Sequence, residues 1–196
     1  MQKKTPNLKS NVLVSIITVV KNNEKYLEET IKSVLNQSYK NFEYIIIDGN
    51  STDDSLKIIQ KYDKDIDFWI SEDDKGIYDA FNKGLDLARG KFIVFVNSDD
   101  LLTSNAIRML KEYDTKNPNI DFLFGTVKKH WGTLYGYRPW KIYFSWGFYS
   151  SHSTGFYIKK EAAKKIGKYN LKYTYSADYD YFYRMIVTHK LKGIGT

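Results

Sequence analysis

SEDDKGIYDAFNKGLDLARGKFIVFVNSDD, residues 71–100, is the most informative stretch of the chain. Its first half repeats apolar side chains at helical spacing over residues 77–88, and Gly90 follows as a stop signal. Its second half contains a mostly apolar run, residues 91–96, of the kind that forms a buried strand, and the stretch ends in a pair of acids. A helix followed directly by a buried strand indicates part of a parallel β–α–β unit.

The same alternation of strands and helices extends on both sides of this stretch. Apolar runs predict strands over residues 12–20, 42–47 and 67–70. Apolar spacing predicts a helix over residues 24–37. Capping residues predict two more, one capped within residues 51–54 and running to about 62, and one capped by Thr103 or Ser104 and running to about 113. The sequence therefore predicts an α/β fold with a mainly parallel sheet and helices on both faces.

The pattern changes after Pro118. Residues 120–127 have the composition of a strand, residues 128–157 are dense in Tyr, Trp, Phe and Gly without a clear period, and a last helix begins near Asp178. With 196 residues, of which 42% are hydrophobic, the chain is long enough for one domain with a core of its own. We therefore expect residues 1–196 to form a single domain.

Composition restricts the compartment and the kinds of site. The chain has no cysteine, which excludes disulfides and thiolate metal sites. Residues 1–10 are polar and are not followed by an apolar stretch long enough for a signal peptide, and the run 12–20 is too short to span a bilayer. These features predict a cytoplasmic protein and leave open a peripheral contact with the inner face of the cell membrane.

The net charge of +7 is unevenly distributed along the chain. Residues 1–120 carry 17 lysines and arginines against 19 acids, a balance of −2, whereas residues 121–196 carry 13 against 4, a balance of +9. A basic half suits phosphates, anionic lipid or nucleic acid as a partner. A solvated lysine surface without a partner is the alternative.

Carboxylates lie just beyond two of the predicted strands. Asp48 follows the strand over 42–47, and Asp99 and Asp100 follow the strand over 91–96. In open α/β sheets ligands bind outside the carboxyl ends of the strands, and oxygen ligands there suit Mg²⁺ or Mn²⁺ bridging a diphosphate. Neither a G-x-G-x-x-G nor a P-loop motif is present, so a metal rather than a glycine loop would neutralise the phosphates. The alternative is that the two adjacent acids only turn the chain.

Three segments in order resemble the family 2 glycosyltransferases of the GT-A fold, over almost the whole length from Val12 to Arg184. The stretch VSIITVVKNNEKYLEETIKSVLNQSYKNFEYIIIDGNSTDDS is similar to the nucleotide-binding part of that family, the stretch over 71–100 to its approach to the metal site, and ADYDYFYR to the segment that carries its catalytic base. The resemblance implies a nucleotide-sugar-binding half, residues 12–117, and an acceptor-binding half, residues 118–196. Family members often continue further, so a truncated or a naturally short form is left open.

Five positions match nucleotide-binding positions of the family. The resemblance implies that Thr18 contacts the nucleotide, that Asp48 accepts a hydrogen bond from N3–H of uracil, and that Lys75 lies at a basic position near the nucleotide. Asn97 and Asp99 complete the set. Many members have Asp where this chain has Asn97, and the loss of one charge there is expected to lower metal affinity.

The same resemblance assigns the metal and the base. Asp99 and Asp100 match the metal-binding acids, which implies Mn²⁺ or Mg²⁺ as cofactor. Asp178 matches the general base, and its alternative role is that of a first-turn helix acid. Arg184 has the spacing to pair with Asp180 at i+4, and we expect that pairing rather than a contact with substrate.

The acceptor side is expected in the aromatic part of the chain. His152 corresponds to a histidine found near the acceptor in related sequences, and Trp146 lies in an aromatic segment, residues 131–157, whose rings suit sugar stacking or a membrane interface. A second small core is the alternative for these rings, and a structural role is the alternative for His152.

The sequence thus predicts an inverting glycosyltransferase that moves a sugar from a nucleoside-diphosphate donor, preferably a UDP-sugar, to an acceptor hydroxyl. By family analogy the product would be a polysaccharide or a lipid-linked oligosaccharide. One rival is a sugar-nucleotide nucleotidyltransferase, but the loop VVKNNEKY after the first strand lacks the glycines that such an enzyme needs. The other rival is a non-enzymatic nucleic-acid-binding module, which the basic half would suit, although no nucleic-acid motif is recognisable.

Overall fold

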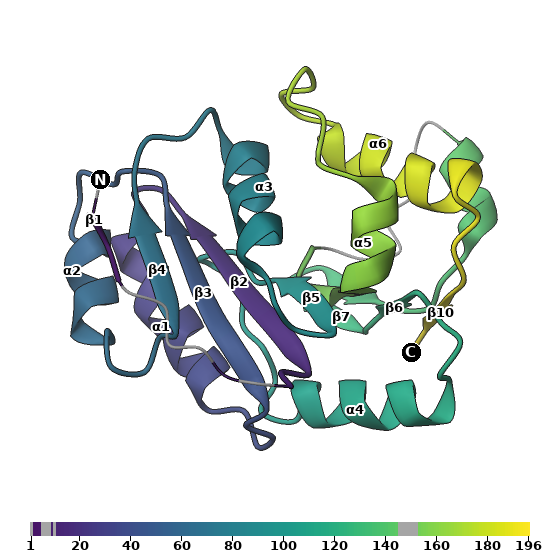
Figure 1. The fold of residues 1–196 in the computed structure, drawn as a ribbon, viewed down its shortest axis with the longest axis horizontal. Helices are drawn as coiled ribbons and strands as arrows, with labels where there is room; N and C mark the ends of the chain where they lie inside the picture. Colours follow the sequence, from purple (N-terminus) through teal and green to yellow (C-terminus); the bar gives the residue numbers. More distant parts are fainter. Residues whose placement is uncertain (1, 5–8, 10, 145–152) are drawn as a thin grey trace.

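An eight-stranded sheet forms the centre of the computed structural model, which describes residues 2–4, 9, 11–144 and 153–196 (Figure 1). Its strand order is β1-β4-β3-β2-β5-β9-β6-β10, and β7 and β8 form a separate hairpin. The strands are β1 (Gln2–Lys3), β2 (Val14–Val20), β3 (Phe42–Asp48), β4 (Phe68–Ser71), β5 (Phe92–Phe95), β6 (Phe122–Phe124), β7 (Val127–Lys129), β8 (Gly132–Leu134), β9 (Phe156–Lys159) and β10 (Gly193–Gly195).

Helices connect most of these strands. The α-helices are α1 (Glu24–Leu35), α2 (Ser55–Lys61), α3 (Ile77–Leu87), α4 (Ala106–Lys116), α5 (Lys160–Ile166) and α6 (Ala177–Tyr183). Short 3₁₀ turns are η1 (Pro139–Tyr143) and η2 (Ser153–Gly155), and η3 (Arg184–Thr188) is a π-helical turn. In the part of the chain that the structure describes, none of the helices has both the length and the apolar character needed to cross a membrane.

The first four long strands are parallel, as predicted. β2 pairs with β3 and β5, and β3 pairs with β4, so all four end at the same edge of the sheet. The register places Val20 opposite Asp48, and Asp48 opposite Ser71. Parallel pairing is thus what brings the loops after these strands together.

β9 was not predicted, and it changes the sheet. It lies antiparallel between β5 and β6, so the sheet continues from the first part of the chain into the second without a break. β6 ends at Phe124 and β7 begins at Val127, so the predicted strand over 120–127 is in fact two separate strands.

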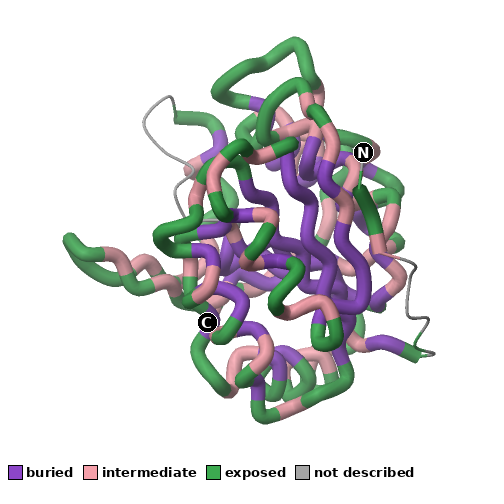
Figure 2. The backbone as a smooth tube through the Cα atoms, turned by 90° about the vertical axis from the view of Figure 1, so that its left-hand side faces the viewer, coloured by how far each residue is buried: buried purple, intermediate pink, exposed green. Residues whose placement is uncertain are grey.

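Two apolar layers cover the sheet. One face packs against α1, α2 and α4, through residues such as Leu27, Ile59 and Leu110. The other face packs against α3, α5 and α6, through residues such as Phe81 and Ala163. Figure 2 shows the resulting pattern, with buried strands in the interior and exposed turns around them. The prediction of helices on both faces is confirmed.

Local hydrogen bonds explain where α2 and α4 begin. α4 begins at Ala106 rather than near 103, because the carbonyl oxygens of Thr103 and Ser104 accept bonds from Gln37 and Ser38. α2 begins at Ser55 and its cap is Asp54, the last of the four residues expected to offer a cap, because the residues before it bond to the loop that follows β2. Neither of the predicted caps at 103 and 104 is the capping residue, which is Asn105.

The turn between α3 and β5 is fixed by a buried ion pair. Glu43 is fully buried, and one of its carboxylate oxygens accepts bonds from Nε and Nη2 of Arg89 at 2.8 and 2.6 Å. Its other oxygen accepts bonds from the Ser15 hydroxyl and the Arg89 backbone N–H. Gly90 is therefore a packing residue and not a helix cap, since a Cβ there would lie 2.5 Å from the backbone nitrogen of Ser15.

Replacing Arg89 by methionine should destabilise the protein strongly. Arg89→Met leaves the Glu43 carboxylate buried without its cation, and removal of one partner of a buried pair costs about 3–5 kcal/mol. Because the arginine side chain is 30% exposed, we expect the lower end of that range in the free energy of unfolding measured with urea. Lys168→Met is the matched control, because its pair with Asp86 is exposed and its loss should cost less than about 1 kcal/mol. Equal losses for both variants would contradict the stabilising role of the buried pair.

Candidate active site

Four loops meet at the carboxyl edge of the sheet, one after each of β2, β3, β4 and β5. The loop after β2 ties two of the others together through Asn23. Its backbone N–H donates to the Ser55 hydroxyl at 3.0 Å, and its side-chain amide donates to the Ser98 hydroxyl at 2.8 Å. The edge is therefore a connected polar surface and not a set of independent loops.

Asp48 is the last residue of β3 and is fully buried. One carboxylate oxygen accepts the Ser51 hydroxyl at 2.5 Å, and the other accepts the Ser71 hydroxyl at 2.6 Å. The carboxylate is thus held between its own turn and the end of β4. Because the carboxylate is fully buried and already accepts two serine hydroxyls, the predicted contact with uracil requires a local rearrangement that exposes an oxygen or displaces a serine.

Thr18 lies differently from the sequence expectation. It sits two residues before the end of β2, is fully buried, and its hydroxyl is 3.0 Å from that of Tyr44. Its side chain therefore belongs to the core of the sheet, and the predicted contact between Thr18 and a nucleotide is not available to its hydroxyl in this arrangement.

The loop after β4 is shaped by two glycines. A Cβ on Gly49 would lie 2.2 Å from a carboxylate oxygen of Asp74, so the acid of this loop packs directly against the turn after β3. Gly76 has φ of 104°, a left-handed conformation that favours glycine, and its N–H donates to Asp74. Lys75, between Asp74 and Gly76, has an exposed side chain, as expected for a residue that could contact phosphate. The ammonium group of Lys21 lies 3.9 Å from Asp74.

The acids after β5 are placed differently from one another. Asp99 is exposed, and Asp100 is half-buried. One carboxylate oxygen of Asp100 accepts the Thr154 hydroxyl at 2.5 Å and the side-chain amide of Asn97 at 3.2 Å. The backbone carbonyl of Asp100 accepts the Thr30 hydroxyl at 2.9 Å. Asp100 is therefore a fixed anchor of this loop, while Asp99 faces solvent.

The two acids suit a divalent cation that also binds substrate. Among the described residues no group of three or more His, Cys, Asp or Glu side chains is placed to hold a metal ion. Mg²⁺ is commonly held by one or two carboxylates, with substrate phosphates and water completing its coordination. Asp99 and Asp100 are two adjacent carboxylates, so their chemistry fits a metal whose coordination is completed by a diphosphate.

Asp178 lies in the first turn of α6 and is brought to the first turn of α3. Its carboxylate accepts the Tyr78 hydroxyl at 3.2 Å, across a separation of 100 residues. Tyr78 directly follows the loop after β4, so the proposed base stands beside the same edge as Asp48. Burial, together with the nearby Asp178 charge, raises the pKa of Tyr78 to about 12, which keeps its hydroxyl protonated and able to donate at neutral pH.

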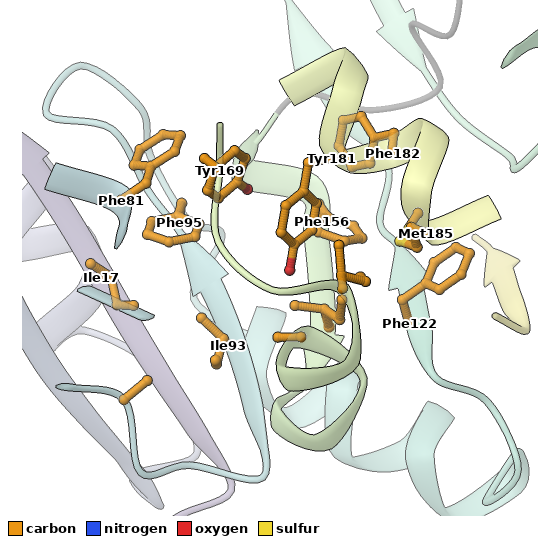
Figure 3. Close-up of a cluster of buried hydrophobic side chains, with 14 of the residues drawn as sticks. Ile17, Phe81, Ile93, Phe95, Phe122, Phe156, Tyr169, Tyr181, Phe182 and Met185 are labelled. Atoms are coloured by element: carbon orange, nitrogen blue, oxygen red, sulfur yellow. The ribbon is translucent and has the colours of Figure 1, made fainter. Parts of the chain in front are cut away.

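A stack of aromatic rings holds α6 against α3 (Figure 3). Tyr169 lies between Phe81 of α3 and Tyr181 of α6, and its ring is stacked on that of Tyr181 with centroids 4.3 Å apart. The side chain of Asn82 bonds to both backbone polar groups of Tyr169. The position of Asp178 therefore depends on packing between α3, α6 and the segment that precedes α6.

Arg184 has the structural role expected of it. Its guanidinium pairs with Asp180 at 2.8 Å and also donates to the backbone carbonyls of Ile166 and Lys168. The prediction of an i+4 pair is confirmed, and the arginine ties the end of α6 to the end of α5.

The predicted acceptor residues His152 and Trp146 lie outside the described residues. In the neighbouring segment, Trp131, Tyr135 and Trp140 are 63%, 69% and 54% exposed. The alternative of a second small core is therefore wrong for these rings. A hollow of about 590 Å³ lies elsewhere, at the amino edge of the sheet. Its bases are largely paired with acids, as Lys91 is with Asp114, and we assign it no role.

Sequence comparison relates the chain to known glycosyltransferases. The family model described as "Glycosyl transferase family 2" matches residues 15–182. The chain belongs to this family. An uncharacterized glycosyltransferase of Methanocaldococcus jannaschii is 32% identical over 89% of this chain and 64% of its own length. The UDP-Glc:alpha-D-GlcNAc-diphosphoundecaprenol beta-1,3-glucosyltransferase WfgD of Escherichia coli is 38% identical over 59% of this chain and 46% of its own length.

Solved structures show the same fold in other glycosyltransferases. Staphylococcus aureus TarS in complex with UDP matches with a TM-score of 0.73 and 19% identity, over 89% of this chain and 55% of that one. A mannosyltransferase of Pyrobaculum calidifontis in complex with GDP-Man and Mn²⁺ matches with a TM-score of 0.72 and 18% identity, over 96% and 56%. The fold is GT-A, as predicted, and the chain spans about half the length of these structures.

Sequence reasoning missed four residues that organise the site. Tyr78 and Thr154 hold the two key acids, and Ser51 and Ser71 hold Asp48. The place of Tyr78, in the first helical turn after a candidate loop, was a usable signal. Ser51 lies three residues after Asp48, so its contact is a local one within the same turn. Ser71 reaches Asp48 from the neighbouring strand and Thr154 comes from a segment without periodicity, so no local pattern marked those two.

Tyr181 offers a test of the aromatic stack. Its hydroxyl is buried and has no hydrogen-bond partner among the described residues, so Tyr181→Phe should leave the free energy of unfolding at neutral pH unchanged or slightly higher. Tyr44→Phe is the contrast, since it loses the bond to Thr18 and should cost about 1 kcal/mol. Urea unfolding of both variants provides the measurement. A Tyr181→Phe loss as large as that of Tyr44→Phe would show that the hydroxyl is satisfied.

The same stack predicts weakness in alkali. Burial raises the pKa of both Tyr169 and Tyr181 above the ordinary value of about 10. Their contribution to stability is therefore complete below about pH 10 and is lost as the pH rises toward the folded-state pKa. The urea midpoint should fall above about pH 10, and Tyr181→Phe should make that fall shallower. A midpoint that is unchanged above pH 10 would contradict the raised pKa values.

Proposed function

We propose that the chain is the catalytic part of an inverting glycosyltransferase, which moves a sugar from a nucleoside-diphosphate donor to an acceptor hydroxyl. The observation that carries this proposal is the bond between Asp178 and Tyr78. That bond holds a carboxylate from near the C-terminus at the carboxyl edge of the sheet, where Asp48, Asp99 and Asp100 also lie. A base on one side and a pair of acids for a metal-bound diphosphate on the other are what a single displacement needs.

In the proposed reaction the oxygen of the acceptor hydroxyl attacks the anomeric carbon of the donor sugar, and Asp178 accepts the proton of that hydroxyl. The bond from that carbon to the diphosphate breaks in the same step, so the configuration inverts and no covalent intermediate forms. Asp99 and Asp100 would hold Mn²⁺ or Mg²⁺, which when bound offsets the negative charge on the departing diphosphate. Tyr78 keeps the Asp178 carboxylate in place by donating a hydrogen bond to it.

We further propose a UDP-sugar as the donor. Asp48 is the acid that would accept N3–H of uracil, and the Escherichia coli relative is named for a UDP-Glc donor. TarS has been solved with UDP, whereas the mannosyltransferase has been solved with GDP-Man, so the fold alone does not determine which nucleobase is bound.

For the acceptor we propose a saccharide carried on a lipid. Two relatives, from Escherichia coli and Campylobacter jejuni, are named for acceptors attached to diphosphoundecaprenol or PP-undecaprenol. An acceptor of this kind would place the reaction in the cytoplasm, at the inner face of the cell membrane, in the synthesis of a surface polysaccharide.

The metal requirement and the preference for uracil can be tested together by calorimetry. UDP should bind more tightly with Mn²⁺ than with EDTA, and more tightly than GDP under the same conditions. Asp100→Asn should weaken UDP binding in Mn²⁺ by roughly tenfold or more, since a charged contact contributes about 1.5–3 kcal/mol. In EDTA the variant and the wild type should bind alike. Equal affinity in Mn²⁺ and EDTA would refute the metal role, and a preference for GDP would refute the role of Asp48.

The base is tested by Asp178→Asn, which keeps the size of the side chain but cannot take a proton. The rate of sugar transfer should fall by about 10²–10⁴-fold. The affinity for UDP should change little, because donor binding involves other residues. Asp180→Asn is the neighbouring control: it breaks the pair with Arg184 and should lower stability more than turnover. Near wild-type transfer by Asp178→Asn would leave Asp178 as a helix-start residue, and Asp180 would be the next candidate.

A further inference from the structure

Residues 127–144, which we call the aromatic arm, present large rings to solvent. The aromatic arm consists of the β7–β8 hairpin, the following turn and η1. Its exposed rings, with their exposed fractions, are Trp131 (63%), Tyr135 (69%), Trp140 (54%), Tyr143 (68%) and Phe144 (44%). So many exposed tryptophans and tyrosines in one short segment indicate a surface that meets a partner.

The aromatic arm is also strongly basic. It contains Lys128, Lys129, Arg138 and Lys141, and no acid occurs anywhere between Asp121 and Glu161. In the part of the chain that the structure describes, none of these four cations forms an ion pair. The charge is therefore available to an anionic partner, in contrast with the paired cations at the amino edge of the sheet.

Both ends of the aromatic arm contact residues that are next in sequence to residues of the candidate active site. At its start, Val127 packs against Gly155, where a Cβ would lie 2.5 Å from the valine methyl, and the adjacent Thr154 bonds to Asp100. Near its end, the backbone carbonyl of Ile142 accepts the hydroxyl of Tyr179, the residue next to Asp178. A partner held by the aromatic arm would lie beside the proposed base and the proposed metal acids.

We propose that the aromatic arm docks the protein on the surface of an anionic lipid membrane. Tryptophan and tyrosine rings settle at the boundary between headgroups and acyl chains, while lysines and arginines attract anionic headgroups. The inference rests on the proposed function in one respect: a lipid-linked acceptor gives the docking its purpose. It identifies the surface of the chain that meets the membrane.

A single-stranded nucleic acid is the other partner that aromatic rings and basic side chains can suit. Such binding uses a groove that follows the backbone and stacks successive bases. The rings of the aromatic arm stand on a hairpin and a short turn, and they do not line either of the two hollows near Tyr39 and Lys111. A lipid surface therefore fits the aromatic arm better, and binding to nucleic acid in place of vesicles would contradict the proposal.

The test is co-sedimentation with vesicles of phosphatidylcholine, with and without phosphatidylglycerol, in the absence of any donor. The wild-type protein should bind only the anionic vesicles and should dissociate when salt is raised from about 0.1 M to about 1 M. Tryptophan fluorescence should shift to shorter wavelength on binding. Lys128→Glu with Lys129→Glu should weaken the partitioning by about 25-fold or more, since each lysine near such a surface contributes about a fivefold factor.

The matched control is Lys64→Glu with Lys116→Glu, which makes the same change in net charge on exposed positions of the other half. Trp131→Ala and Trp140→Ala should also weaken binding, whereas Tyr26→Ala, an exposed aromatic on α1, should not. Calorimetry with UDP separates this proposal from the proposed function, because the aromatic-arm variants should keep the wild-type affinity. No binding of wild type at low salt, equal effects of aromatic-arm and control variants, or salt-sensitive binding to single-stranded RNA without binding to vesicles would overturn the proposal.

Discussion

Parallel pairing of β2, β3, β4 and β5 determines where the candidate site lies. Strands that run in the same direction must end at the same edge, so the loops that follow them cannot avoid one another. Each loop carries short polar side chains that bond to the neighbouring loop, as Asn23 does to Ser55 and Ser98. The chemistry of the edge therefore follows from topology, since carboxylates that are far apart in the sequence are brought together by the direction of the strands.

The sequence predicted those features that depend on local periodicity. The helix over 77–88 appears as α3, which ends one residue earlier, and the strand over 91–96 appears as β5, which is one residue shorter at each end. Amphipathic spacing determines the helix, and a buried apolar run determines the strand. β9 could not be predicted in the same way, since its antiparallel place between β5 and β6 is a long-range pairing with no local mark. Gly90 was misinterpreted for a related reason: it follows a helix, but its function is close contact with Ser15.

Of the candidate site, the acids could be predicted and their partners could not. Asp48, Asp99 and Asp100 end or follow apolar runs, which is a pattern visible in the sequence. What fixes Asp48 and Asp100 is a hydroxyl from elsewhere, from Ser71 of β4 in one case and Thr154 of η2 in the other. The same holds for Asp178, whose place depends on Tyr78 and on the stack formed by Tyr169 and Tyr181. Side-chain contacts between distant segments require the fold before they can be recognised.

The proposed contact between Asp48 and a nucleobase has to be compatible with a carboxylate that is already hydrogen-bonded. Its two oxygens accept hydrogen bonds from serine hydroxyls, which offset part of the cost of burying the carboxylate. Exchange of one hydroxyl for the N–H of a base replaces one hydrogen bond by another and costs little net free energy, provided that the released serine finds another partner. A base that displaced a serine without offering an N–H would leave the carboxylate one donor short, and that deficit is the larger quantity. Discrimination would then arise from the penalty imposed on the wrong base, while the serines keep the site stable when no nucleotide is bound.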